Sequence, residues 1–478
     1  MIHPVDLSIF IVYLLAMLGV GLYFLRRNKD IDDYYVGGRG MSSWHIGLSV
    51  VATDVGGGFS IGLGGLGFAM GISGSWMLFT GLLGAWLAGT FLIPKVFKLL
   101  GQHKMYTFPE IFGHLFNPQV ALVAGIVSAI GYMGFTSAQI LAGAKLATAT
   151  FPSMDLNTAI WVMGITAVVY TVFGGLKAVI YTDTVQWALL MGGLVFIGIP
   201  LAYLEVGGYA AIRDTVEPSF LALTNIAPVK LLNWAVTIIP IWFVGMTLYQ
   251  RIYACRDEKT ARKAWFLAGL FEYPVMAFMG VLLGLFARVA LDQGMFASMG
   301  YTSLAGMDAE MGLPVLLRTI LPVGLMGLMM SAYFSAIMST ADSCLMAASG
   351  NLVTDIAARF FPIPKEVLLR YSQVATFVTG ALALTLATFM TQVLDLMLLS
   401  YSFMVSGLLV PLLAAFFFKK KDARAALVAM LVGGGTTLVL EIGKIGLDLG
   451  MPLGLDPNIF GISAAFVSYF STAKINET

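Results

Sequence analysis

Apolar stretches of about twenty residues alternate with short polar stretches along nearly the whole chain. A helix needs about 20 apolar residues to cross the hydrocarbon core of a bilayer, so the pattern predicts an all-α, polytopic membrane protein. The segment 107–116 is too short to cross and is predicted to be an interfacial helix. About thirteen transmembrane helices are predicted, and they lie near residues 5–25, 43–69, 73–100, 119–148, 157–176, 181–205, 231–253, 262–290, 312–350, 368–391, 393–418, 424–445 and 457–473.

Basic residues follow the odd-numbered predicted spans. Arg26, Arg27 and Lys29 follow the first span and a lysine run at 419–421 follows the eleventh, whereas the loop 291–311 contains no Lys or Arg. The positive-inside rule then places the N-terminus outside and the C-terminus in the cytoplasm. We therefore expect a multi-pass protein of the cell inner (plasma) membrane.

Composition agrees with a membrane protein and excludes several other classes. The chain is 59% hydrophobic and 11% charged, whereas soluble domains carry about 25% charged residues. The formal net charge of +1 gives no reason to expect nucleic acid as a partner. Neither an ATPase phosphate-binding loop nor a zinc-protease motif occurs, so the prediction is that the protein is not an enzyme. The bilayer is the expected partner, and no obligate protein partner is evident.

Four polar residues interrupt the ninth predicted span: Ser339, Thr340, Asp342 and Ser343. Polar and ionisable groups at membrane depth are costly and usually mark an ion or substrate path. Ser339, Asp342 and Ser343 have the i, i+3, i+4 spacing of one helical face. Their hydroxyl and carboxylate oxygens suit a hard cation. The alternative is that these small residues only allow close helix packing, but four polar groups including an acid favour ion binding.

The second predicted span contains Asp54 followed by the glycines of 56–58. Glycine in a helix interior costs about 1 kcal/mol relative to alanine. We therefore predict unwinding near Asp54–Gly58, with carbonyl oxygens facing a cavity, as in the broken helices of secondary transporters. The alternative is a packing face of small residues, with Asp54 bonded to a neighbouring helix.

Two further polar positions lie near span ends. Asp183 begins the sixth predicted span, where Asp183 or Thr182 could cap a helix or Asp183 could bind an ion; both alternatives stay open. Arg251, at the inner end of the seventh span, is predicted to extend its long side chain to the cytoplasmic face. Tyr249 or Gln250 could then face a cavity.

Three segments resemble the signatures of the sodium/solute symporter family and occur in the family's order: Asp32–Arg39, Gly174–Asp183 and Ser339–Ser343. The similarity covers about residues 5 to 420. It implies sodium-coupled uptake of a solute by alternating access, with Na⁺ as the coupling ion.

The resemblance also implies the fold typified by the bacterial leucine transporter, which is built from two inverted five-helix repeats. The expected organisation is a single transmembrane domain, 1–478. Within it we expect an extra N-terminal helix (1–30), a first repeat (43–205), a second repeat (231–418) and C-terminal helices (424–478).

Cation ligands also follow from the resemblance. The implied main sodium site consists of the carbonyls of Ala52, Val55 and Ala336 and the hydroxyls of Ser339 and Thr340. A second cation site, known in the sialic acid symporters of the family, has its matching positions at Asp183, Ser339, Asp342 and Ser343. Asp342 stands where that relative has Ser, which could strengthen a cation site or replace it with a proton site.

The solute is predicted from a smaller set of positions. Asp54 matches an acidic position of the sodium/proline symporters, whereas the more distantly similar choline transporters have Trp there. Their aromatic cage is replaced near Gly134 and Gly245, and a quaternary amine needs aromatic faces. The predicted solute is an amino acid or a related amine-bearing compound, with a monocarboxylate as the alternative; a cation channel or a sensor are the other classes considered. The predicted solute-binding residues are Asp54, Gly56, Gly57, Gly58, Phe59, Gly134 and Tyr249.

Overall fold

The structure is a computed structural model that describes residues 3–25, 35–54, 56–151, 153–361, 364–418, 421–447 and 449–473. Helices make up most of these residues, and no β-strand occurs among them. The predicted all-α class is therefore confirmed.

The helices vary in length from three to 38 residues. The longer ones are α1 (Pro4–Leu25), α3 (Ser43–Asp54), α4 (Gly56–Met70), α5 (Trp76–Leu87), α8 (Pro118–Thr150), α9 (Leu156–Gly193), α12 (Pro228–Val244), α13 (Met246–Ala254), α14 (Glu258–Leu270), α15 (Ala277–Asp292), α17 (Leu325–Gly350), α19 (Lys365–Ala387), α20 (Val393–Phe416), α21 (Ala423–Leu447) and α22 (Pro457–Thr472). The shorter ones are α6 (Ile93–Leu100), α7 (Pro109–Leu115), α10 (Ile199–Glu205), α11 (Gly208–Thr215), α16 (Gly312–Ile320) and α18 (Ala358–Phe360).

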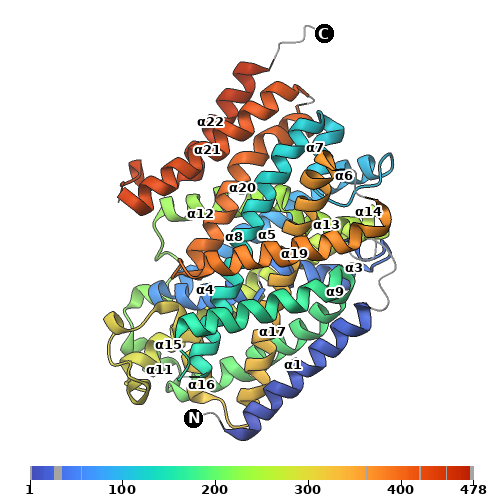
Figure 1. The fold of residues 1–478 in the computed structure, drawn as a ribbon. Coiled ribbons are helices and arrows are strands. Elements are labelled where there is room, and N and C mark those ends of the chain that lie inside the picture. The colour runs from blue at the N-terminus through green and yellow to red at the C-terminus, as the bar shows by residue number, and fades with distance from the viewer. Residues whose placement is uncertain are drawn as a thin grey trace.

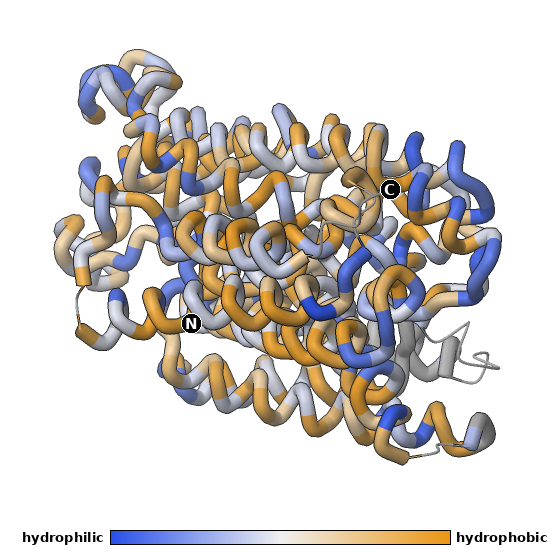
Figure 2. Tube along the Cα trace, turned by 90° about the horizontal axis from the view of Figure 1, so that it is seen from above, coloured by the Kyte–Doolittle hydropathy of each residue, from blue (hydrophilic) through white to orange (hydrophobic). Residues whose placement is uncertain are grey.

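Seven helical stretches among the described residues are long and apolar enough to cross a membrane, or eight if the bent pair α12–α13 counts as one span. The hydrophobic positions run through the body of the bundle, with most hydrophilic residues toward its edges (Figure 2). The chain is therefore a multi-pass membrane protein, but the structure does not confirm thirteen separate spans.

Three of the predicted spans differ from the helices that form. The predicted span 312–350 is divided into α16 and α17, because Leu321 has the extended conformation favoured before a proline and Gly324 has φ +87°, which glycine adopts without strain. The predicted span 157–176 and the first part of the predicted span 181–205 share the single helix α9, which continues through Lys177 where a loop was expected. The second span then continues to Glu205 through a π-helix (Leu194–Gly198) and α10.

The polar helix α17 lies at the centre of the fold. It packs against α8, α9 and α4, and α8 packs in turn against α20. Figure 1 shows α21 and α22 at one end of the molecule and α1 toward the other. Nearly all residues of α17 are buried, so its polar side chains must find their partners within the protein.

Glycines allow the helix α15 to approach α4 closely. A Cβ atom added at Gly284 would lie 1.9 Å from the carbonyl oxygen of Gly64, and one added at Gly67 would lie 2.1 Å from that of Val281. Small residues serve this purpose widely at helix contacts in membranes. Part of the glycine content is therefore explained by backbone-to-backbone packing.

The helix pair α12–α13 is broken at Gly245, with a 41° bend. Gly245 adopts an extended conformation, so the first amides of α13 lack carbonyl partners from a preceding turn. The Tyr132 hydroxyl on α8 accepts a hydrogen bond from the Thr247 amide at 3.1 Å and lies 3.0 Å from the Thr247 hydroxyl. Protein groups thus cover the irregular backbone, as membrane depth requires.

The predicted unwinding of the second span is wrong for Gly56–Gly58. These glycines form the first turn of α4, and α3 continues to Asp54; Val55 lies outside the described residues. Gly58 instead allows close packing, because a Cβ atom there would lie 2.5 Å from Oε1 of Gln139 on α8.

Candidate functional site

The first group of oxygens joins α17 to α3. The Thr340 hydroxyl donates to the carbonyl of Ala52 at 2.9 Å and to that of Ala336, one turn earlier, at 3.2 Å. These residues are three of the five predicted ligands of the main sodium site. Val55 lies outside the described residues, and the Ser339 hydroxyl donates to Asp183 instead. Clustered carbonyl and hydroxyl oxygens of this kind can coordinate a hard cation.

Asp183 is fully buried on α9 and has three polar partners. It accepts hydrogen bonds from Ser339 and, at 2.5 Å, from Ser49, and its Oδ2 lies 3.7 Å from Nη2 of Arg251. Asp183 lies well inside α9, whose N-cap is Asp155. The capping alternative is therefore wrong, and the acid belongs to a buried polar cluster.

Arg251 is the cation of this cluster, and its predicted extension to the cytoplasmic face is wrong. Its side chain is fully buried. Its partners are Ser49 (Nε, 3.2 Å), the Thr247 carbonyl (Nη1, 3.2 Å), Thr53 (Nη2, 2.6 Å) and Ser343 (Nη2, 2.8 Å). A buried guanidinium is tolerated only with such partners. The prediction failed because α13 packs against α3 and α17, which keeps Arg251 away from the surface.

Asp342 faces a different neighbour from the rest of the predicted second cation site. Its Oδ1 accepts a hydrogen bond from Thr171 at 2.5 Å, whereas its Oδ2 is buried and has no hydrogen-bond partner among the residues that the structure describes. Asp183 and Ser339 are directly bonded, and Ser343 joins them through Arg251. Among the described residues Asp183 has a basic counterion and Asp342 has none.

The predicted solute-binding residues are only partly brought together. Gly58 contacts α8, and a Cβ atom added at Gly134 of α8 would lie 2.4 Å from the Ser400 hydroxyl of α20. Tyr249 instead donates to the Phe243 carbonyl at 2.7 Å, and its ring centroid lies 4.4 Å from that of Phe108. The side chains of Asp54 and Phe59 lie outside the described part of the structure, as do the surroundings of Gly56 and Gly57.

Gln139 is a buried polar residue that the sequence reasoning missed. It lies on α8 with no exposed surface. Among the described residues its Oε1 has no hydrogen-bond partner, and its Nε2 has only the Met397 sulfur at 3.7 Å. The available signal was an amide in the middle of a predicted span, where polar groups usually serve a function.

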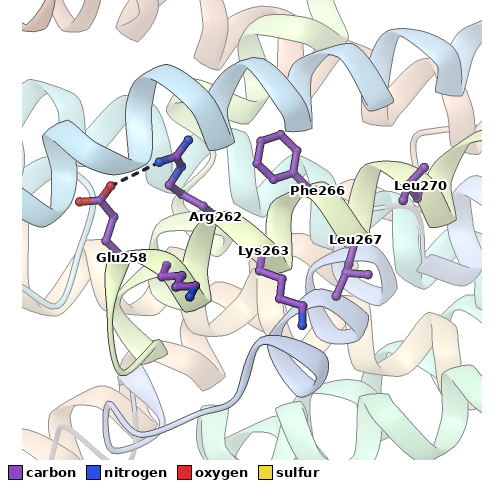
Figure 3. Close-up of a pocket in the computed structure, with 7 residues that line it drawn as sticks. Glu258, Arg262, Lys263, Phe266, Leu267 and Leu270 are labelled. Carbon is purple, nitrogen blue, oxygen red and sulfur yellow. Dashed lines mark ion pairs between the residues drawn. The ribbon is translucent and has the colours of Figure 1, made fainter.

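A surface cavity of about 590 Å³ lies along α14. Figure 3 shows Glu258 and Arg262 toward one end of its lining and Phe266 and Leu270 toward the other. All the described lining residues belong to α14. This surface groove therefore lies apart from the buried groups around Asp183 and Gln139.

Comparison with known proteins identifies the relatives of this chain. Residues 34–433 match the model of the sodium:solute symporter family. Sodium/glucose cotransporter 1 of Oryctolagus cuniculus is 26% identical over 393 residues, which cover 74% of this chain and 58% of that protein. The sodium/proline symporter of Escherichia coli (strain K12) is 26% identical over 398 residues, covering 79% and 76% of the two chains. This chain thus spans less than two thirds of the first relative. These relatives are transporters and not enzymes.

The fold is shared with a solved transporter structure. A Na⁺-coupled sialic acid symporter, solved in a substrate-bound outward-open state, superimposes with a TM-score of 0.76 at 22% identity, and the match covers 98% of both chains. The shared architecture therefore extends over nearly the whole of both chains.

Proposed function

This chain belongs to the sodium:solute symporter family, and from this premise we propose that it is a secondary active symporter. Sodium entry drives the uptake of a small organic solute by alternating access. The observation that carries the proposal is the Thr340 hydroxyl held between the Ala52 and Ala336 carbonyls, 2.9 and 3.2 Å away. It supports a cation site because α3 and α17 bring three oxygens together in the membrane interior.

The main sodium site uses these three residues together with Val55 and Ser339. Ser339 is also the hydrogen-bond donor to Asp183, so one hydroxyl serves two neighbouring groups. A cation that recruits Ser339 to the main site removes a donor from Asp183. The occupancy of the main site is thereby linked to the Asp183–Arg251 pair.

A second cation, sodium or a proton, binds near Asp342, with Asp183, Ser339 and Ser343 around it. The support is the charge distribution: Arg251 compensates Asp183, whereas Oδ2 of Asp342 is buried without a partner. A buried carboxylate without a counterion is unfavourable. A cation at this position supplies the missing charge.

The two inverted repeats, 43–205 and 231–418, remain part of this proposal, as does the orientation with the N-terminus outside. The bend at Gly245 supports the repeat assignment, because a discontinuous helix near the start of a repeat is typical of such transporters.

The proposed solute is an amino acid or a related amine-bearing compound, and a monocarboxylate is the alternative. Its ammonium group pairs with Asp54, and Gly56, Gly57 and Gly58 lie beside its carboxylate. Phe59, Gly134 and Tyr249 complete the proposed solute site. The similarity to the sodium/proline symporter supports the amino-acid class.

Uptake into proteoliposomes tests the proposal. Sodium-dependent, saturable and electrogenic uptake of a radiolabelled amino acid is expected, which also separates symport from a channel. Replacing both Ser339 and Thr340 with alanine should sharply raise the sodium concentration for half-maximal uptake. Ser331→Ala is the matched control, because that hydroxyl on α17 bonds only within its own helix, to Gly327 at 2.6 Å. Unchanged sodium dependence in the double variant would contradict the proposed site.

A further inference from the structure

The Gln139 side chain has an environment that does not satisfy an amide. It is fully buried, its Oε1 has no hydrogen-bond partner in the described part of the chain, and a thioether sulfur such as that of Met397 is a weak acceptor. Both ends of the amide lie in the space that a side chain at position 58 would fill. A Cβ atom added at Gly58 would lie 2.5 Å from Oε1 and 2.6 Å from Nε2.

Such an amide is unfavourable in a protein interior. Buried polar groups in native proteins are nearly always bonded, and each exception calls for an explanation. A leucine at this position would fill a similar volume without leaving an acceptor unpaired. The amide is therefore expected to gain its partner in another state, when a ligand is bound.

We propose that Gln139 binds the polar end of the transported solute. Its Nε2 donates to a carboxylate of the solute, and its Oε1 accepts from an ammonium group. The inference rests on the proposed function, since it assumes that a solute enters between α4, α8 and α20. The unbranched Met397 side chain changes its rotamer readily, so it moves away from Nε2 when the solute binds. Gly58 leaves room for the amide.

The Gln139 amide offers one donor group and one acceptor, and this combination favours one class of solute. An α-amino acid uses both ends of the amide. A monocarboxylate uses only Nε2, and a trimethylated ammonium group offers no N–H to Oε1. Sites built to hydrogen-bond a ligand group discriminate strongly against analogues that lack it. The geometry therefore favours amino acids over monocarboxylates and over quaternary amines.

The variant Gln139→Leu tests the inference because it has two effects of opposite sign. The melting temperature of the solute-free protein should rise, since the unpaired amide is gone. The affinity for L-alanine or L-proline, measured by equilibrium binding to purified protein at fixed sodium, should fall on the order of 10- to 100-fold. The matched control is Ser137→Ala on the same helix, whose hydroxyl bonds to the carbonyls of Met133 at 2.9 Å and Ala383 at 2.8 Å. It should lower the melting temperature and leave the affinity unchanged.

A second variant and two other ligands keep the inference testable if the leucine variant folds poorly. Gln139→Glu keeps the size and one acceptor but loses the donor, so the affinity for L-alanine and for propionate should fall. Glycine betaine should bind the wild-type protein more weakly than the amino acids.

Three outcomes would overturn the inference. One is a Gln139→Leu protein that melts lower and binds amino acids normally, which would make the amide structural. The others are wild-type protein that binds propionate or betaine as tightly as amino acids, or that binds none of them. These equilibrium measurements need no sodium gradient, so their failure is distinct from a failure of sodium-driven uptake.

Discussion

Removing the Arg251 side chain should destabilise the protein and should increase the rise in melting temperature that sodium causes. In Arg251→Met, the fully buried Asp183 loses its only basic partner among the described residues, 3.7 Å away. Ser49, Thr53 and Ser343 lose the guanidinium at the same time. Removing one partner of a buried ion pair typically costs about 3–5 kcal/mol, because the remaining charge is uncompensated.

The double variant Asp183→Asn/Arg251→Met separates the ion pair from the packing of the two side chains. With both charges removed, the free energy of unfolding should be higher than that of Arg251→Met by on the order of 2 kcal/mol, the usual scale of coupling between contacting groups. Arg213→Met is the control, since Arg213 pairs only with its neighbour Asp214 and is 61% exposed. Exposed pairs contribute little, so this change should be nearly neutral.

Sodium provides the second readout. A cation that replaces the guanidinium beside Asp183 binds the native state and stabilises it by mass action. The rise in melting temperature on replacing choline chloride with sodium chloride should therefore be larger in Arg251→Met than in the wild type. Wild-type stability of Arg251→Met would refute the ion-pair argument. A destabilised variant with no added response to sodium would show that Asp183 is not a cation ligand.

Three further predictions concern separate parts of the molecule. Gly284→Ala should cost about 1–3 kcal/mol by overpacking α15 on α4, because its Cβ would lie 1.9 Å from a backbone oxygen; Gly192→Ala, with nothing within 4 Å, is the control in the same thermal unfolding assay. Burial raises the pKa of Glu110, on α7 between two spans, from 4.5 to about 7, so the folded protein binds a proton that the unfolded chain releases. The free energy of unfolding should therefore fall by about 3 kcal/mol as the pH rises from 4.5 to about 7. Glu110→Gln should abolish that part of the pH dependence. Asp342→Asn should reduce the charge moved per solute by one, measured as a reversal potential in proteoliposomes; an unchanged reversal potential would make Asp342 structural.

The helical class and many of the helices could be predicted because they depend on local patterns. The apolar runs at 5–25, 119–148 and 393–418 correspond to α1, α8 and α20. The division of the ninth predicted span was missed although Pro322 and Gly324 were visible, since hydropathy averaged over a window hides a short break. The glycines of 56–58 were interpreted as helix breakers because the sequence does not show which neighbour they contact.

The pattern of residues could predict only one side of the candidate site, and Ala52 was expected opposite Thr340 only through the family resemblance. The polar residues of α17 are conspicuous within an apolar run, so Ser339 and Thr340 were found. Their partners lie far away in the sequence: Arg251 is 92 residues from Ser343, and Thr340 is 288 residues from Ala52. Helical spacing reveals a face but does not reveal the helix opposite it. For this reason Arg251 and Gln139 had no assigned partners before the fold was known.

The contacts of α17 explain how the proposed cation sites could respond to helix movement. Within five residues this helix presents Ser339 to Asp183 of α9, Thr340 to Ala52 of α3 and Ser343 to Arg251 of α13. A shift of α3 relative to α17 would therefore change the distance from the Thr340 hydroxyl to the Ala52 carbonyl, and a shift of α13 would change the distance from the Arg251 guanidinium to the Ser343 hydroxyl. A cation bound between these helices favours the arrangement in which its oxygen ligands converge, and an ion stabilises a conformation only through such a difference in affinity. Coupling in this protein then follows from α17 carrying ligands that face several helices at once.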